Sequence, residues 1–144
     1  MQTAEELTTR FRAEGLRVTP QRQAIFRLLE GNTRHPTVEA LHDAVRVDMP
    51  MVSLKTVYQT VHDLEALGEV ALLDLGTGSV RVDPNVEVEH HHLVCRVCGA
   101  VQDVPLAEVP ALPRRYRREF QLDATEVIFR GVCDSCSTPS TDPA

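Results

Sequence analysis

The chain has 144 residues and a mass of 16.0 kDa, which suits one domain or two small lobes and excludes a large multidomain machine. Hydrophobic residues make up 42% and charged residues 25%, a globular composition that excludes wholesale disorder. The net charge of −6 argues against a generally cationic nucleic-acid binder. The first residues lack a secretory leader and no long apolar run follows, so we expect a soluble, cytoplasmic protein without a membrane partner.

Four helices are predicted in the first half of the chain, where apolar residues recur at helical spacing. Thr19, Thr37 and Ser53 stand directly before the last three apolar runs, where a side-chain oxygen can cap a helix, and Pro20 suits a first helical position. The apolar positions are, in order, Leu7 and Phe11; Ile25, Leu28 and Leu29; Val38, Leu41 and Val45; and Leu54, Val57, Val61, Leu64 and Leu67.

The hydrophobic period then changes to that of β-strands. Residues 69–75 and 79–83 are predicted strands, joined through glycines as a β-hairpin. Three helices, a recognition-type helix and a hairpin are the order of a winged helix-turn-helix. We therefore predict an α+β protein in which residues 1–82 form a winged-helix DNA-binding domain.

The remainder of the chain predicts a second, smaller lobe. Residues 83–89 are expected to form a hinge and residues 90–137 a small α/β lobe. The polar residues 138–144 are expected to form a flexible tail. The predicted elements of the lobe are strands over 92–95, 100–104 and 126–131, and a short helix from Arg114 to Phe120.

A local basic patch lies within this acidic chain. Residues 10–34 contain six arginines against two glutamates, a local charge of +4. A phosphate-binding surface would explain this patch, and so would a solvated helix face.

All the cysteines lie in the last third of the chain, as the pairs Cys95/Cys98 and Cys133/Cys136. Each C-x-x-C turn offers two thiolates to neighbouring corners of a tetrahedron, so the two pairs together predict a structural zinc site. The 34 residues between Cys98 and Cys133 imply that this site joins elements that are distant in sequence. A redox-active dithiol pair is the main alternative, and two disulfides are a weaker one.

A second set of metal-ligand residue types surrounds the first cysteine pair. His90 and His92 would point to one face of a strand, with Asp83 upstream and Asp103 downstream. Imidazole and carboxylate ligands suit Fe(II), Mn(II), Zn(II) or Ni(II). A solvated strand end is the alternative interpretation.

His35 stands just before the third predicted helix and is, on its own, typical of a loop residue. If it instead joined the histidine and carboxylate set, a bound ion would clamp one lobe against the other. The ion would favour only the conformation that brings its ligands together. Such a clamp is the physical form of a metal-dependent DNA switch.

Five motifs occur in order along the chain. They are RVTPQR at 17–22, HPT at 35–37, SLKTVY at 53–58, HHHLVCRVC at 90–98 and GVCDSC at 131–136. Together they resemble the Fur family of metal-dependent transcriptional regulators. The resemblance implies a homodimer, with the winged helix on double-stranded operator DNA and a C-terminal α/β dimerisation lobe. It also implies one structural zinc per subunit, held by Cys95, Cys98, Cys133 and Cys136.

The resemblance further implies one regulatory Fe(II) or Mn(II) per subunit. Its ligands fall on His35, Asp83, His90, His92 and Asp103. The aspartates at positions 83 and 103 make this set most like the PerR branch. That branch senses hydrogen peroxide, which through bound Fe(II) would oxidise His35 or His90 and release the metal and the DNA. Thr125 and His91 depart from the family's additional metal site, so we expect no third site.

We therefore expect a repressor, not an enzyme, that binds a pseudo-palindromic operator as a homodimer. The expected DNA contacts are Arg17, Gln21, Arg22, Ser53, Lys55, Thr56, Tyr58 and Gln59. The nearest alternative is a Fur-family regulator that senses iron or manganese supply. A hydrolase with an open metal position and a constitutive architectural DNA-binding protein are alternatives from other classes.

Overall fold

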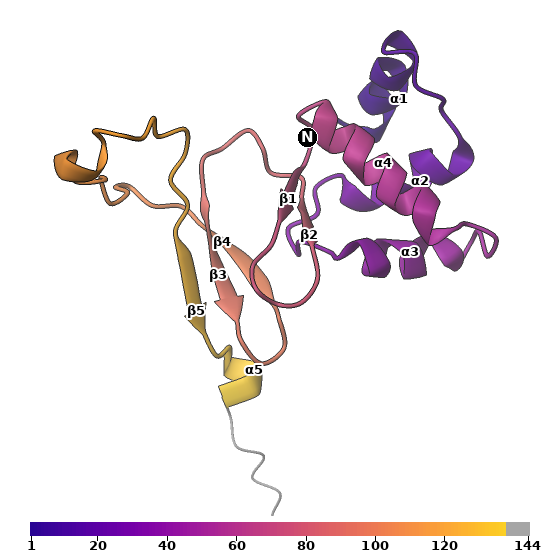
Figure 1. The fold of residues 1–144 in the computed structure, drawn as a ribbon. Coiled ribbons are helices and arrows are strands. Elements are labelled where there is room, and N and C mark those ends of the chain that lie inside the picture. Colours follow the sequence, from indigo (N-terminus) through magenta and orange to yellow (C-terminus); the bar gives the residue numbers. More distant parts are fainter. Residues whose placement is uncertain (138–144) are drawn as a thin grey trace, which may run out of the picture. The chain divides into compact units, whose positions relative to one another are not determined.

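The computed structural model describes residues 1–137, which fold into two compact units, Met1–Val88 and a second unit that begins at Glu89. The first unit contains helices α1 to α4 and strands β1 and β2, and the second contains strands β3 to β5 (Figure 1). Among the described residues, no helix is long and apolar enough to cross a membrane. The tail expected at 138–144 lies outside the described residues.

The four predicted helices are confirmed as α1 (Ala4–Ala13), α2 (Pro20–Leu29), α3 (Val38–Arg46) and α4 (Leu54–Ala66). Thr19, Thr37 and Ser53 each accept a hydrogen bond from a backbone N–H in the first turn, as their positions predicted. The sequence pattern did not reveal a fourth cap, in which Thr3 and Glu6 form a reciprocal capping box. The Thr3 backbone and side chain lower the pKa of Glu6.

The core of the first unit forms where the apolar stripes of the helices meet. Phe11 and Phe26 pack edge to face with ring centroids 4.8 Å apart. Val82 of the hairpin is fully buried against the same cluster. Leu54, the first residue of α4, is 38% exposed and is an exception among the predicted core positions.

The predicted hairpin is confirmed, although its strands are short. β1 (Ala71–Leu73) pairs antiparallel with β2 (Arg81–Asp83), so Ala71 lies opposite Asp83. A single bridge between Thr37 and Arg81 adds the segment before α3 to the other edge of β2. The wing is therefore joined to the helical core through the loop that carries His35.

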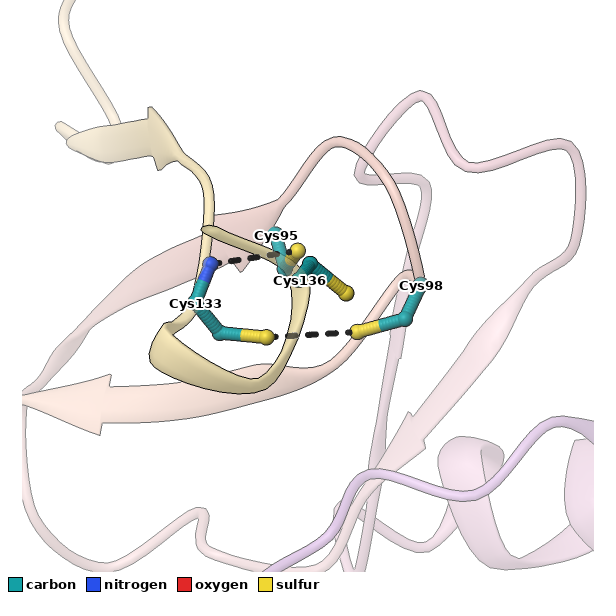
Figure 2. A group of neighbouring side chains, drawn as sticks. All are labelled: Cys95, Cys98, Cys133 and Cys136. Atoms are coloured by element: carbon teal, nitrogen blue, oxygen red, sulfur yellow. Dashed lines mark hydrogen bonds between the residues drawn. The ribbon is translucent and has the colours of Figure 1, made fainter. Parts of the chain in front are cut away.

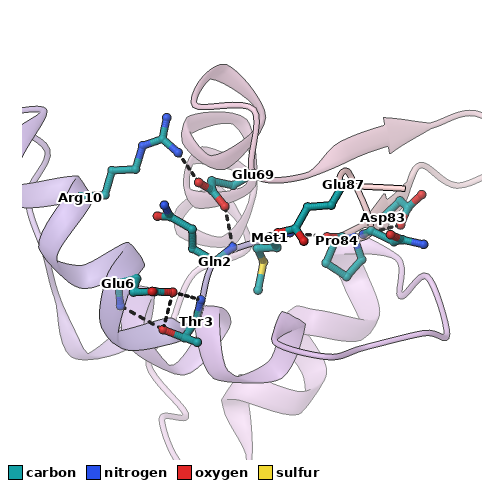
Figure 3. Close-up of polar contacts among 10 residues, drawn as sticks. Met1, Gln2, Thr3, Glu6, Arg10, Glu69, Asp83, Pro84 and Glu87 are labelled. Atoms are coloured by element: carbon teal, nitrogen blue, oxygen red, sulfur yellow. Dashed lines mark hydrogen bonds and ion pairs between the residues drawn. The ribbon is translucent and has the colours of Figure 1, made fainter. Parts of the chain in front are cut away.

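Polar contacts tie the start of α1 to the residues that follow α4 (Figure 3). Glu69 is buried and accepts a hydrogen bond from the Gln2 backbone N–H (2.7 Å). Arg10 forms an ion pair with Glu69 and also donates to the Leu67 carbonyl (2.9 Å). The backbone nitrogen of Met1 donates to the Pro84 carbonyl (2.9 Å), which fixes the chain directly after β2.

The second unit contains a three-stranded sheet in the order β4-β3-β5. β3 (His91–Cys95) pairs antiparallel with β4 (Val101–Val104) and parallel with β5 (Ile128–Gly131). These strands match the predicted ones to within one or two residues at their starts. The parallel pairing aligns Cys95 with Gly131, so it brings the two cysteine pairs to the same end of the sheet.

The helix predicted from Arg114 to Phe120 is wrong in extent. Only a 3-10 turn, η1 (Arg114–Tyr116), forms there. It has no side-chain cap and buries no residue, so no packing energy extends it. A short helix, α5 (Asp134–Ser137), was not predicted and carries Cys136.

Candidate metal centres

The cysteine cluster lies where the turn after β3 meets the segment from β5 to α5. Figure 2 shows the four side chains converging from these two segments. The Sγ atoms of Cys95, Cys98, Cys133 and Cys136 all lie within 4.8 Å of one another. Two C-x-x-C turns distant in sequence therefore form one cluster, as their spacing predicted.

The geometry of this cluster fits a tetrahedral zinc ion. Zinc–sulfur bonds of about 2.3 Å place thiolates on neighbouring corners of a tetrahedron roughly 3.8 Å apart. The Cys98 and Cys133 sulfurs are 3.7 Å apart, although they come from different pairs. The backbone N–H of Cys133 donates to the Cys95 sulfur (3.4 Å), as is usual for a thiolate ligand.

The four thiols do not ionise equally. Hydrogen bonds from the backbone N–H groups of Cys98, Cys133 and Val97 lower the pKa of Cys95 to about 6. By contrast, the side chains of Cys133 and Cys98, helped by burial, raise the pKa of Cys136 to about 12. Crowded thiolates repel one another, and a divalent cation would remove this obstacle to full ionisation.

The first unit brings together two of the five expected ligands of the regulatory site. The Nε2 atom of His35 lies 3.5 Å from the Oδ1 atom of Asp83, and both side chains are about 98–99% buried. The Asn85 backbone N–H donates to the same carboxylate oxygen (2.8 Å). This pair offers one imidazole nitrogen and one carboxylate oxygen as possible metal ligands.

The backbone holds His35 in an unusual conformation. Its φ is +50°, the left-handed region that non-glycine residues rarely adopt. Arg81 Nη1 donates to the His35 carbonyl (3.2 Å), and the Val82 N–H donates to the next carbonyl, that of Pro36 (2.9 Å). The sequence pattern did not single out Arg81, although alternation along a strand places it on the same face as Asp83.

The second unit brings together the other three expected ligands. One ligand atom from each of His90, His92 and Asp103 lies within 4.8 Å of the others. Asp103 lies opposite His92 on the paired strands, and its Oδ1 atom is 3.6 Å from His90 Nε2. The sequence argument for a shared strand face therefore agrees with the positions of these three side chains.

Two further interactions at β3 were not predicted from the sequence. The carboxylate of Glu126 lies 3.3 Å from His92 Nδ1. On the opposite face, the Val127 N–H donates to His91 Nδ1 (3.3 Å), so the buried His91 ring is used to hold the chain before β5.

The residues expected at the DNA surface fall into two groups. Arg17 and Lys55 are exposed, Gln21 is half-buried, and Ser53 and Thr56 are bonded to each other at the start of α4. The other three residues bond to acidic side chains. Tyr58 donates to Glu39 (2.7 Å), a bond that lowers the Glu39 pKa and raises the Tyr58 pKa. Arg22 and Gln59 both bond to Asp63 (2.6 and 2.9 Å).

Comparison with known proteins identifies the family of this chain. The family model described as the ferric uptake regulator family matches residues 13–130. The chain belongs to this family. The transcriptional regulator FurA of Mycobacterium tuberculosis is 35% identical over 143 residues, covering 98% of this chain and 97% of FurA. The peroxide-responsive repressor PerR of Staphylococcus aureus is 32% identical over 134 residues, covering 92% and 90% of the two chains.

Solved structures of Fur-family proteins share the fold. A zinc-bound manganese uptake regulator matches with a TM-score of 0.71 and 34% identity, covering 92% of this chain and 99% of that one. The Helicobacter pylori regulator Fur matches with a TM-score of 0.74 and 19% identity, covering 97% of each chain. The Fur-family protein described here is therefore a metal-responsive transcriptional regulator, and regulators of this family act as dimers on operator DNA.

Proposed function

We propose that this Fur-family protein is a metal-dependent repressor that senses hydrogen peroxide. Its homodimer would bind a pseudo-palindromic operator when Fe(II) or Mn(II) occupies a regulatory site made of His35, Asp83, His90, His92 and Asp103. Zinc on the four cysteines would hold the second unit together. The sulfur spacing of 3.7 Å across the two cysteine pairs supports the zinc assignment.

The composition of the regulatory site carries the proposal. Its two carboxylates are both aspartates, Asp83 and Asp103, and each lies beside a histidine at 3.5 to 3.6 Å. Oxygen and imidazole nitrogen donors without a thiolate suit Fe(II) and Mn(II). No cysteine lies between Ser79 and His90, which argues against a zinc sensor.

Metal occupancy would be coupled to DNA binding because the ligands belong to both units. An ion that takes donors from both would favour the one arrangement of the units that fits the operator. The start of α4 would then enter the major groove in each subunit, with Ser53, Lys55 and Thr56 near base edges and phosphates.

The peroxide step would alter a ligand. In net terms the O–O bond of hydrogen peroxide and the Cε1–H bond of His35 or His90 break. One oxygen forms a carbonyl at Cε1, the hydrogen from Cε1 moves to the second ring nitrogen, and the other oxygen leaves as water. The imidazole loses two electrons and the peroxide gains two, so no further reductant is needed. Fe(II), held by the histidine and aspartate donors, would supply the redox chemistry for O–O cleavage and would end the net reaction in its starting oxidation state. The oxidised ring is a poorer donor, so the metal and then the DNA are released.

A second candidate function is a sensor of manganese or iron supply. It is supported by the 34% identity to the zinc-bound manganese uptake regulator. Such a sensor would use the same donors and the same coupling to DNA, but its histidines would survive peroxide.

Peptide mass spectrometry on Fe(II)-loaded protein would separate these functions. The protein is loaded without oxygen, treated with a small excess of hydrogen peroxide and digested, with Mn(II)-loaded protein in parallel. We expect one added oxygen on the peptide that contains His35 or His90 in the Fe(II) sample alone. His62, an exposed histidine on α4, is an internal control and should stay unmodified.

Two outcomes would contradict peroxide sensing. If His35 and His90 stay intact while Fe(II) is bound, the supply sensor is correct. If His62 is oxidised equally, the modification is non-specific. A His35→Ala variant that still binds the operator only with Mn(II) would overturn the regulatory site itself.

A further inference from the structure

We propose that Glu126 is a positioning residue that fixes the ring of His92, so that Nε2 is the nitrogen that binds the regulatory metal. The proposal rests on the function proposed above, and it adds a residue that is neither a ligand nor a DNA contact.

The interaction lies wholly within the second unit. The Glu126 carboxylate faces His92 Nδ1 at a distance of 3.3 Å. The His92 side chain is 4% exposed, whereas that of Glu126 is 49% exposed. The carboxylate therefore reaches a buried ring from the surface, and its own charge stays partly solvated.

Such a carboxylate selects one form of the imidazole. A neutral histidine has one N–H and one lone pair, and a carboxylate can only accept. Glu126 therefore favours the form with the proton on Nδ1, which leaves the Nε2 lone pair for a metal. The acceptor also stops the ring from turning.

The backbone makes this arrangement rigid. The His92 N–H donates to the Val127 carbonyl (3.2 Å), and the Val127 N–H donates to His91 Nδ1 (3.3 Å). Both bonds hold the residue directly after Glu126, and the parallel register then aligns His92 with Ile128. The carboxylate is thus placed relative to the ring by hydrogen bonds of the neighbouring main chain.

A ligand role for Glu126 fits these distances less well. Nδ1 and Nε2 lie at different positions of the imidazole ring, and their bonding directions diverge. A carboxylate on Nδ1 and a cation on Nε2 are therefore separated by the ring. In addition, His90, His92 and Asp103 belong to the cluster whose ligand atoms lie within 4.8 Å of one another, and Glu126 does not.

The test combines a spectroscopic signature with metal affinity. Nitrogen-15 NMR of histidine-labelled, zinc-containing protein without regulatory metal reports the tautomer of His92. We expect the proton on Nδ1 in the wild type and a shift toward the Nε2 form in Glu126→Ala. The Mn(II) dissociation constant should rise by about tenfold to hundredfold in Glu126→Ala and by less in Glu126→Gln, which keeps an acceptor oxygen.

Controls separate this proposal from the one on which it rests. Glu119→Gln changes an exposed carboxylate in the same unit and should alter neither readout. If His92→Ala binds Mn(II) as the wild type does, the regulatory site is wrong. If His92→Ala loses Mn(II) but Glu126→Ala does not, only the positioning role is overturned. A weaker affinity in Glu126→Ala with an unchanged tautomer would also overturn it, and urea unfolding checks that each variant is folded.

Discussion

At the scale of single residues, His35 combines features that point to a role beyond packing. It is buried, it lies 3.5 Å from Asp83, and its φ of +50° costs conformational energy. The fold keeps it there because Arg81 donates to its carbonyl and because Thr37, two residues later, forms a β-bridge with Arg81. Strain held at a candidate ligand is consistent with a donor that is set in place before the metal arrives.

Arg81→Met tests whether the hydrogen bond to the His35 carbonyl sets His35 in place. Methionine keeps an unbranched side chain but donates no hydrogen bond. Losing the bond to the His35 carbonyl should lower the free energy of unfolding by about 1–2 kcal/mol. It should also raise the Mn(II) dissociation constant about tenfold. Urea unfolding and a competition titration measure the two effects. Arg46→Met, an exposed change in α3, is the control, and equal Mn(II) affinity in both variants would refute the role of Arg81.

At the scale of elements, α2 and α4 are joined by the bond of Arg22 to Asp63. The side chains of this pair are only 13% and 16% exposed, and the Arg22 guanidinium also lies 5.3 Å from the centre of the Phe11 ring. An arginine expected from the sequence to contact DNA thus contributes to the helix packing. Arg17, in the loop before α2, is exposed.

Matched substitutions should separate these two arginines. Arg22→Met leaves Asp63 without its cation, so we expect it to lower the free energy of unfolding by about 1–3 kcal/mol. Arg17→Met should leave stability unchanged but weaken operator binding, and every phosphate that is no longer neutralised should reduce the salt dependence of log K by about 0.9. Fluorescence anisotropy at several salt concentrations measures this slope. An unchanged slope in Arg17→Met would remove Arg17 from the interface.

The elements also explain which parts of the site were predictable. Caps and apolar spacing are local, so they predicted α2, α3 and α4 and the core they form. The cysteine spacing and the alternation of His90 and His92 predicted two clusters without knowledge of the sheet. Glu126 and Arg81 were missed because their roles depend on pairings that no local pattern specifies. The parallel pairing of β3 with β5 spans more than thirty residues and brings Glu126 to His92.

At the scale of the whole molecule, the five residues proposed as regulatory ligands are divided between the two units. His35 and Asp83 belong to the first, and His90, His92 and Asp103 belong to the second. The ligand atoms within each set already lie close together. Under the proposed function, metal binding would need little rearrangement inside a unit, and its free energy would act on the arrangement of one unit relative to the other.

Small-angle X-ray scattering on the zinc-containing dimer tests this coupling. Addition of stoichiometric Mn(II) should reduce the radius of gyration and the maximum dimension, because arrangements that separate the two ligand sets are depopulated. His35→Ala removes a donor from the first unit only, so Mn(II) should bind it more weakly and leave its scattering unchanged. His62→Ala, on α4, is the control and should respond as the wild type does. Cys98→Ser would not be suitable, because it disturbs the proposed zinc site. Identical scattering with and without bound Mn(II) in the wild type would show that the metal does not act through the two units, and the repressor would then need a different link between ligand and DNA.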